Sequence, residues 1–217
     1  MNGDLFAGLP PAPPSTTRLG PGTVLLRGRA ASLAEHIARQ LPALLAQAPF
    51  RQMQTPGGYR MSVAMSNCGP YGWVTDRHGY RYAATDPESD RPWPALPPEW
   101  RALAIDAAAD AGFPDFRPDA CLINRYLPGA KMALHQDKDE RDLAAPIVSV
   151  SLGLPATFLL GGLQRGAPTE RILLEHGDVL VWGGPDRLRF HGVAALKPGH
   201  QALFGEQRIN LTLRQAA

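Results

Sequence analysis

Turn-forming residues divide the second half of this chain into segments that are too short for stable helices. The 217-residue sequence contains 22 Gly and 22 Pro, about a fifth of its positions, against roughly 12% in an average protein. An interior proline costs a helix about 3 kcal/mol, so frequent turns favour short strands. Seven such runs follow residue 119: ACLINRY, IVSVSLGL, ATFLL, RILLEH, DVLVWG, LRFHGV and RINLTLR.

These runs predict antiparallel strands that close into a double-sheet jelly roll or barrel. Hydrophobic residues make up 44% of the chain, which is enough for a packed core, and this length favours one domain. Because two helical segments precede the strands, the expected fold class is α+β, dominated by β.

The first helical segment begins near Ser32, in SLAEHIARQLPALLAQA. Ser32 and Glu35 have the spacing of a capping box, and apolar residues recur on one face. Pro42 removes an interior N–H, so a kink or a short break is expected there. The second segment opens with the prolines 97–98 and runs through EWRALAIDAAADAG.

The other N-terminal segments are expected to be irregular or hairpin-like. Residues 1–22 are rich in proline and predict a loose, extended leader, with order beginning near Val24. Residues 50–95 hold much of the aromatic and turn content. The alternation from Tyr59 to Met65 predicts a strand, and HGY predicts a tight turn before a second strand, so we expect a long hairpin excursion.

Charge and cysteine content limit the kind of protein this is. The net charge of +2 allows a locally bound anion but does not indicate a basic nucleic-acid arm. The two cysteines, Cys68 and Cys121, are too few for a disulfide framework, which favours a reducing compartment. The first residues lack the pattern of a signal peptide, and no run of about 18 apolar residues occurs. We therefore expect a cytoplasmic protein without a membrane segment.

His135 and Asp137 form the first candidate metal-binding motif, in LHQDKDE. In an extended segment their spacing directs both side chains to one face, as a 2-His-1-carboxylate site requires. His-x-Asp also occurs in solvated charged turns, so a third ligand is needed. His176 and His200 lie in turn sequences, whereas His191 closes an alternating run before a glycine. We therefore expect His191 to be the third ligand.

The last run, RINLTLR, places two arginines on one face of a strand. Arg208, Asn210, Thr212 and Arg214 alternate with apolar residues that pack in the core. A buried guanidinium requires an anionic partner, because an uncompensated buried charge costs several kcal/mol. Either an internal carboxylate or a ligand supplies it. A dicarboxylate beside a metal would fit, since arginine binds carboxylates through two parallel bonds.

These motifs together resemble the AlkB family of iron(II)- and 2-oxoglutarate-dependent dioxygenases, most closely the bacterial alkylation-repair enzymes. The resemblance rests on LINRYLPGAKMALHQDKDE, on His191, which follows Asp137 by 54 residues, and on RINLTLR, which begins 17 residues later. R-x-N-x-T-x-R after H-x-D and H is the family's signature. The segments TPGGYRMSVAMSNCG, GWVTDRHGY, PDFRPDACLINRY and HGDVLVWGG also match in order. Ile209 stands where members often carry an aromatic residue, and it should face away from the site.

The resemblance implies an iron(II) centre held by His135, Asp137 and His191, with 2-oxoglutarate and O2 as cosubstrates. These three residues are therefore the implied catalytic set. In the family reaction, 2-oxoglutarate is converted to succinate and CO2 while an N-methyl group is hydroxylated and then lost as formaldehyde.

The resemblance also implies a binding site for 2-oxoglutarate on the last strand. The far carboxylate would bind Arg208 and the hydroxyl of Tyr126. Asn124, Asn210 and Arg214 would contact the metal-bound end or orient the carboxylate ligand of the metal.

The implied partner is alkylated DNA carrying 1-methyladenine or 3-methylcytosine, preferably single-stranded, with RNA as a further substrate. These bases are cationic, and a cation favours an aromatic face and a carboxylate. They pair poorly, so extruding them costs less than extruding a normal base. Trp73 would stack on the base opposite His135, and Asp139 would accept a bond from the exocyclic amine. Contacts to phosphate or the damaged base are implied for Tyr80, Thr55, Lys131 and Arg165.

The implied organisation is one catalytic domain over residues 23–217, acting as a monomer. A nucleotide-recognition lid would occupy about 50–95, and the jelly-roll core about 119–217. A double-stranded β-helix with N-terminal helices and a β-hairpin lid is therefore the expected architecture.

Two other functions remain open at this point. One is a 2-oxoglutarate oxygenase that acts on a protein side chain or a small molecule and shares the metal site but not the aromatic lid. The other is a non-catalytic jelly-roll binder of the cupin type. Such a binder does not need both Arg208 and Arg214, and the His-x-His pair of cupins is absent here.

Overall fold

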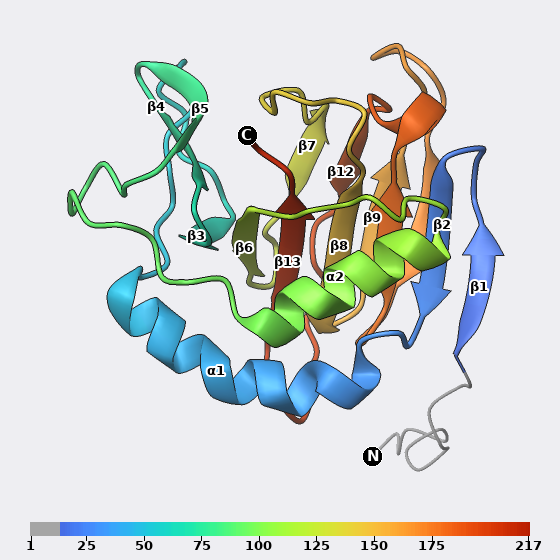
Figure 1. The fold of residues 1–217 in the computed structure, drawn as a ribbon, viewed down its shortest axis with the longest axis horizontal. Helices are drawn as coiled ribbons and strands as arrows, with labels where there is room; N and C mark the ends of the chain where they lie inside the picture. The colour runs from blue at the N-terminus through green and yellow to red at the C-terminus, as the bar shows by residue number, and fades with distance from the viewer. Residues whose placement is uncertain (1–13) are drawn as a thin grey trace.

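The computed structural model describes residues 14–217, which form a layered β structure covered by two helices (Figure 1). The helices are α1 Ala34–Gln47 and α2 Pro98–Asp110, with short 3-10 turns at Ala31–Leu33 and Gly184–Asp186. The strands are β1 Ser15–Arg18, β2 Thr23–Arg27, β3 Ala64–Cys68, β4 Gly72–Asp76, β5 Gly79–Ala83, β6 Ala120–Tyr126, β7 Met132–His135, β8 Ile147–Gly153, β9 Ala156–Leu160, β10 Glu170–Leu174, β11 Val179–Trp182, β12 His191–Val193 and β13 Arg208–Arg214.

Two facing sheets form the jelly roll that the sequence predicts. One sheet has the order β1-β2-β11-β8-β13-β6-β3, and the other has the order β10-β9-β12-β7. Neighbouring strands within both sheets are antiparallel. All seven predicted runs contain strands, and β7 is an additional strand of only four residues. β4 and β5 pair only with each other, as a separate hairpin.

Strand β13 lies between two hydrophobic cores. Its residues divide into an apolar face and a polar face, as predicted. Ile209, Leu211 and Leu213 pack with the helices on the outer face of the large sheet. The arginines at both ends of the strand face the space between the sheets, where Phe158, Leu160 and other residues form the second core. Period-two alternation thus places the polar set beside the smaller sheet.

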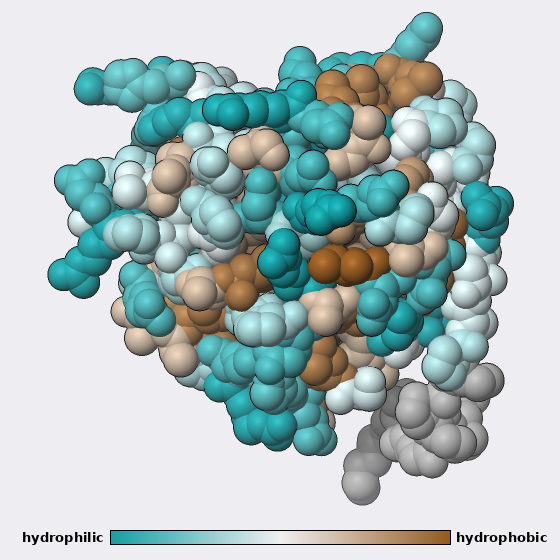
Figure 2. Space-filling view, in the orientation of Figure 1, coloured by the Kyte–Doolittle hydropathy of each residue, from teal (hydrophilic) through white to brown (hydrophobic). Residues whose placement is uncertain are grey.

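Helices α1 and α2 cover the outer face of the large sheet (Figure 1). In the same view, the surface over them is mainly hydrophilic, with apolar side chains gathered in small patches (Figure 2). The buried face of α1 carries Ile37, Leu41 and Leu44, and α2 buries Trp100 and several alanines. Both predicted helices are confirmed in position. Within residues 14–217, neither helix is long and apolar enough to cross a membrane.

Details at the start of α1 differ from the prediction. Ser32 lies within a 3-10 turn, and the N-cap position of α1 is Leu33, which makes no side-chain cap bond. The predicted capping box is wrong because the chain is already helical at Ser32. Pro42 does not break the helix. Its ring lies on the exposed face, and burial of Leu41 and Leu44 on either side holds the helix together.

The expected leader and the first lid strand also need correction. Ser15–Arg18 is an edge strand that pairs with β2, so order begins before Val24, while residues 1–13 lie outside the described part. These four residues are all exposed and pair through their main chain, which is why hydrophobic patterning did not reveal them. β3 begins at Ala64, later than expected, since the Gly57-Gly58 turn leaves Tyr59 78% exposed. The predicted hairpin turn at HGY is confirmed by β4 and β5.

Candidate active site

Three side chains from two strands and a loop converge between the sheets. His135 ends β7, His191 begins β12 opposite it in register, and Asp137 follows two residues after β7. Nε2 of His135 lies 3.5 Å from Oδ1 of Asp137, and Nε2 of His191 lies 3.7 Å from Oδ2. One ligand atom from each residue falls within 4.8 Å of the others. The sequence-based choice of His191 is therefore consistent with the geometry.

Main-chain carbonyls orient both imidazole rings. Nδ1 of His135 lies 2.9 Å from the carbonyl of Ala133, and Nδ1 of His191 lies 3.1 Å from the carbonyl of Arg189. A carbonyl can only accept, so each Nδ1 carries the proton and each Nε2 keeps a free lone pair. Both lone pairs then face Asp137, as ligation of a cation requires.

The pKa values of Asp137 and His191 favour a bound cation, whereas that of His135 does not. Burial alone would raise the pKa of Asp137, but the positive charge of Arg214 and the two imidazoles hold it well below its usual range. Burial and the neighbouring His135 lower the pKa of His191 to about 4. Burial also lowers the pKa of His135, but the Asp137 carboxylate outweighs this effect and raises it. At neutral pH the site therefore offers an ionised carboxylate and a neutral His191.

Arg208 provides the second part of the site, a buried cation with unsatisfied donors. Its guanidinium lies over the ring of Tyr126, 5.1 Å from the centroid, and Nη2 donates to Ser151 Oγ at 3.0 Å. Nε and Nη1 have no hydrogen-bond partner among residues 14–217. Because such orphan donors are costly when buried, a carboxylate of a ligand fits this position. The residues present thus fit a dicarboxylate.

Asn124 and Asn210 lie side by side between Arg208 and the metal-binding cluster. Asn210 Nδ2 donates to Ser149 Oγ at 2.7 Å and to the Val150 carbonyl at 2.9 Å. Its amide nitrogen is therefore occupied by the protein. Oδ1 of Asn124 has no partner in the described part of the chain. This oxygen can only accept, so Asn124 has room for a bond from an N–H or O–H group but not to a carboxylate oxygen.

Arg214 pairs with a carboxylate of the protein, one of the two kinds of anionic partner that the sequence allows for the arginines of RINLTLR. Its Nη2 and Nε donate to Oδ2 of Asp137 at 2.7 and 3.1 Å. The two arginines of β13 therefore have different partners. Arg214 neutralises a protein carboxylate, whereas Arg208 keeps donors for a ligand.

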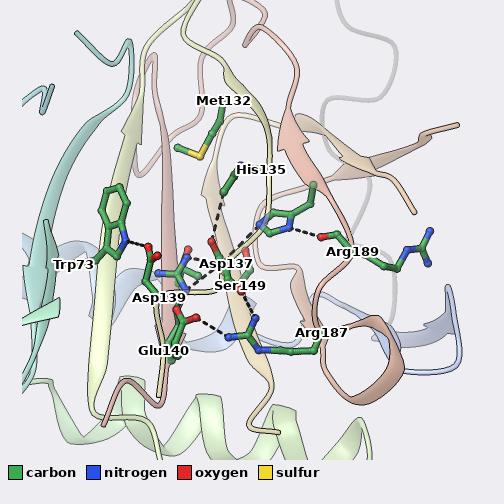
Figure 3. Close-up of polar contacts among 12 residues, drawn as sticks. Trp73, Met132, His135, Asp137, Asp139, Glu140, Ser149, Arg187 and Arg189 are labelled. Atoms are coloured by element: carbon green, nitrogen blue, oxygen red, sulfur yellow. Dashed lines mark hydrogen bonds and ion pairs between the residues drawn. The ribbon is translucent and has the colours of Figure 1, made fainter. Parts of the chain in front are cut away.

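The hairpin β4–β5 brings an aromatic wall to the same cavity. Trp73 stacks on Tyr80 with ring centroids 5.7 Å apart, and its Nε1 donates to Oδ2 of Asp139 at 2.8 Å (Figure 3). Asp139 was expected on a continuing strand, but β7 ends at His135. Asp139 still borders the cavity because Trp73 and Tyr82 of the hairpin bond to the loop after β7.

A cavity of about 470 Å³ connects these groups. Arg165 reaches it by donating to the Leu134 carbonyl at 3.1 Å and covering the ring of Phe190. Lys131 does not line the cavity; its backbone instead exchanges hydrogen bonds with Ser62. The other predicted site residues all line it, namely Thr55, Trp73, Tyr80, Asn124, Tyr126, His135, Asp137, Asp139, Arg165, His191, Arg208, Asn210 and Arg214.

Several supporting residues were not predicted from the sequence. Ser149 and Ser151 alternate in IVSVSLG, a sign that the inner face of β8 carries polar groups. Glu140 and Arg187 form a buried ion pair of 2.8 Å across 47 residues of chain, and no local pattern indicates such a pair.

Comparison with known proteins places this geometry in a family. The 2OG-Fe(II) oxygenase superfamily matches residues 22–214. The alpha-ketoglutarate-dependent dioxygenase AlkB of Salmonella typhimurium is 58% identical over 214 residues, 99% of this chain and 98% of the relative. The chain belongs to the AlkB family. Its membership makes it an iron(II)- and 2-oxoglutarate-dependent dioxygenase, with O2 as cosubstrate.

Two further AlkB-family proteins agree with this assignment. The solved structure of OsALKBH1 has a TM-score of 0.81 and 30% identity, and the match covers 93% of this chain and all of that one. A human relative named nucleic acid dioxygenase ALKBH1 is 34% identical over 126 residues, 58% of this chain and 32% of the relative. The jelly-roll core is therefore that of a dioxygenase family, and the cupin-type binder is excluded.

Proposed function

We propose that this protein oxidatively demethylates 1-methyladenine and 3-methylcytosine in alkylated DNA, releasing formaldehyde, succinate and CO2. One observation carries the proposal: the Trp73 ring and the Asp139 carboxylate border the same cavity as His135, Asp137 and His191. The preferred partner is single-stranded DNA, and alkylated RNA carries the same cationic bases. The names and sequence similarity of the AlkB relatives support a nucleic-acid substrate.

A cationic methylated base matches the aromatic and acidic walls of the cavity. An indole attracts a cation over its face by about 0.5 to 2 kcal/mol, more where water is excluded. Trp73 is held in place by Tyr80 on one side and by its bond to Asp139. One carboxylate oxygen of Asp139 is left to accept a bond from the exocyclic amine. An uncharged base with a normal partner gains less from this site and costs more to extrude.

Basic and polar groups around the opening suit a phosphate backbone. Arg165 is exposed and adjoins the cavity, and Lys131 is exposed beside it. Thr55 and Tyr80 lie on the hairpin side of the opening. We assign these residues to contacts with phosphate or the damaged nucleotide, and the hairpin region 50–95 to a recognition lid.

The other half of the cavity contains the residues that would bind the metal and 2-oxoglutarate. His135, Asp137 and His191 would bind the iron, which supplies the oxidising chemistry when 2-oxoglutarate and O2 are bound. Arg208 and the hydroxyl of Tyr126 bind the far carboxylate of 2-oxoglutarate. Arg214 keeps Asp137 ionised and oriented, and Asn124 and Asn210 line the path between the two sites. These residues would hold the metal beside the methyl group of a base stacked over Trp73.

We assign a single catalytic domain over 23–217 and propose that it acts as a monomer. We place the protein in the cytoplasm, where its nucleic-acid substrate lies. We assign the jelly-roll core of that domain to about 119–217, and β1, β2 and β3 extend its larger sheet.

The proposal is tested by a formaldehyde-release assay on matched DNA and RNA oligonucleotides that carry one methylated base each. We expect formaldehyde from single-stranded 3-methylcytosine and 1-methyladenine DNA and none from the unmethylated strands. Asp139→Asn keeps the side-chain shape and removes the charge, so it should lower this activity about tenfold. Succinate formation without formaldehyde from any methylated oligonucleotide would refute the assignment and favour a protein or small-molecule substrate.

A further inference from the structure

Glu140 is a buried carboxylate that has no place in the chemistry described above. Its side chain is 2% exposed, and it lies outside the cavity lining. Oε1 accepts a hydrogen bond from the Tyr82 hydroxyl at 2.6 Å, and Oε2 accepts one from Arg187 Nη2 at 2.8 Å. A buried charge is retained at a cost of several kcal/mol unless it is fully paired. This environment therefore indicates a specific role for Glu140.

Arg187 connects Glu140 to the loop that carries Asp137 (Figure 3). Its Nη1 donates to the Asp137 carbonyl at 2.6 Å, and its Nε donates to the Ala145 carbonyl at 2.9 Å. One guanidinium thus holds both ends of the irregular segment 137–145. Because Asp137 lies beyond the end of β7, this clamp replaces the strand pairing that fixes His135.

Arg214 connects Glu140 to the side chain of Asp137. Its Nε lies 3.4 Å from Oε1 of Glu140, while the same group donates to Oδ2 of Asp137. Two arginines and two carboxylates therefore form one buried set with no net charge. Glu140 is the member that touches both arginines through its carboxylate, so it sets the position of each.

Tyr82 extends this set to the substrate-binding hairpin. It lies on β5 directly opposite Trp73 of β4, and opposite residues of an antiparallel pair share a face. Trp73 bonds to Asp139 and Tyr82 bonds to Glu140. The hairpin is thus attached to two consecutive residues of the loop that carries the metal ligand.

We infer that Glu140 is a positioning residue for the metal ligand Asp137, and that Tyr82 couples docking of the hairpin to the metal site through it. The inference rests on the proposed metal site at His135, Asp137 and His191. Loss of an outer partner of a ligand typically lowers metal affinity 10- to 100-fold. Base binding at the hairpin is thus linked to the geometry at the metal through the contacts from Tyr82 to Glu140, from Glu140 to the two arginines, and from these to Asp137.

The test is a titration of the metal-free protein with Mn²⁺ alone, read from the EPR signal of free Mn²⁺ without 2-oxoglutarate or nucleic acid. We expect Glu140→Gln to weaken binding about 10- to 100-fold. Tyr82→Phe, which keeps every charge, should weaken it about threefold. In the Glu140→Gln background, Tyr82→Phe should have no further effect, because its influence passes through Glu140.

The matched control is Thr75→Val, which removes a different hairpin contact, the 3.2 Å bond from Thr75 to the Gln54 carbonyl. It should leave Mn²⁺ affinity unchanged. Unaltered affinity in folded Glu140→Gln, or equal effects of Tyr82→Phe and Thr75→Val, would overturn the inference. If Glu140→Gln does not fold, judged by near-UV circular dichroism, the comparison of Tyr82→Phe with Thr75→Val decides. Asp137→Ala separates the two claims, since unchanged Mn²⁺ binding there would refute the metal site itself.

Discussion

The two halves of the active site are built on very different supports. Arg208 and Arg214 stand on β13, a central strand with partners on both sides, and every residue of that strand is buried. Trp73 and Tyr80 stand on a two-stranded ribbon outside both sheets, and Tyr80 is 49% exposed. The half that binds metal and 2-oxoglutarate is therefore fixed by the core. The base-binding half depends on a few side-chain bonds, between Asn67 of β3 and the main chain of Trp73, and from Trp73 and Tyr82 to the loop after β7.

This contrast predicts that the two halves fail differently. Substitutions on the core side should weaken binding of the metal or of 2-oxoglutarate and lower turnover of every substrate equally. Changes on the hairpin should affect recognition of the methylated base and leave 2-oxoglutarate binding intact.

Asp137→Ala is the largest perturbation on the core side. It removes the carboxylate ligand and leaves Arg214 without its partner, so turnover should fall at least about 1,000-fold, toward the background rate. Succinate release with any substrate is the measurement. Near-normal activity would eliminate the assigned metal site.

Arg208→Ala should act on the cosubstrate alone. Deleting a charge-assisted contact of about 1.5 to 3 kcal/mol raises the KM for 2-oxoglutarate about 10- to 100-fold. Steady-state kinetics at saturating methylated DNA measure this change. A normal KM would place the carboxylate site elsewhere, and an equal rise in the KM for DNA would break the separation of the two halves.

Trp73→Ala is the matching change on the hairpin. Loss of a stacking ring costs about 1 to 3 kcal/mol per base, so kcat/KM for single-stranded 3-methylcytosine DNA should fall about tenfold or more. The KM for 2-oxoglutarate should stay unchanged. Trp73→Phe, which keeps an aromatic face, serves as the control and should retain more activity. Unaltered DNA turnover in Trp73→Ala would disprove the base assignment.

The smallest effect is a pH dependence of metal binding to the wild-type protein. Protons compete with the metal for His135, whose pKa is raised by Asp137, while His191 stays neutral until about pH 4. As pH falls through the raised pKa of His135, Mn²⁺ affinity should decline toward a limit of about tenfold per pH unit. An onset of the decline only near pH 4 would contradict the assigned order of titration.

Much of this site could be predicted from the sequence because it depends on strand periodicity. The alternation of Arg208, Asn210, Thr212 and Arg214 fixes a common face before any contact is known, and the strand pairing follows the same pattern. The alternation of Ser149 and Ser151 likewise indicates a polar face on β8. Applying the same period of two to β8 would have predicted these two serines as site residues.

The remaining features depend on contacts between distant segments. Pro42 lies in an unbroken helix because buried leucines on either side pack against the sheet. The pairing of Glu140 with Arg187 and Tyr82 joins three separate segments. Such contacts leave no local pattern, so propensity and spacing could not indicate them.

Measuring two products together shows whether the β4–β5 hairpin binds the base for the dioxygenase core. Formaldehyde and succinate are quantified in parallel for the wild type and for Trp73→Ala on single-stranded 3-methylcytosine DNA. We expect nearly equal amounts from the wild type and a fall of formaldehyde relative to succinate in the variant. An unchanged product ratio together with an unchanged rate would contradict base binding by the hairpin.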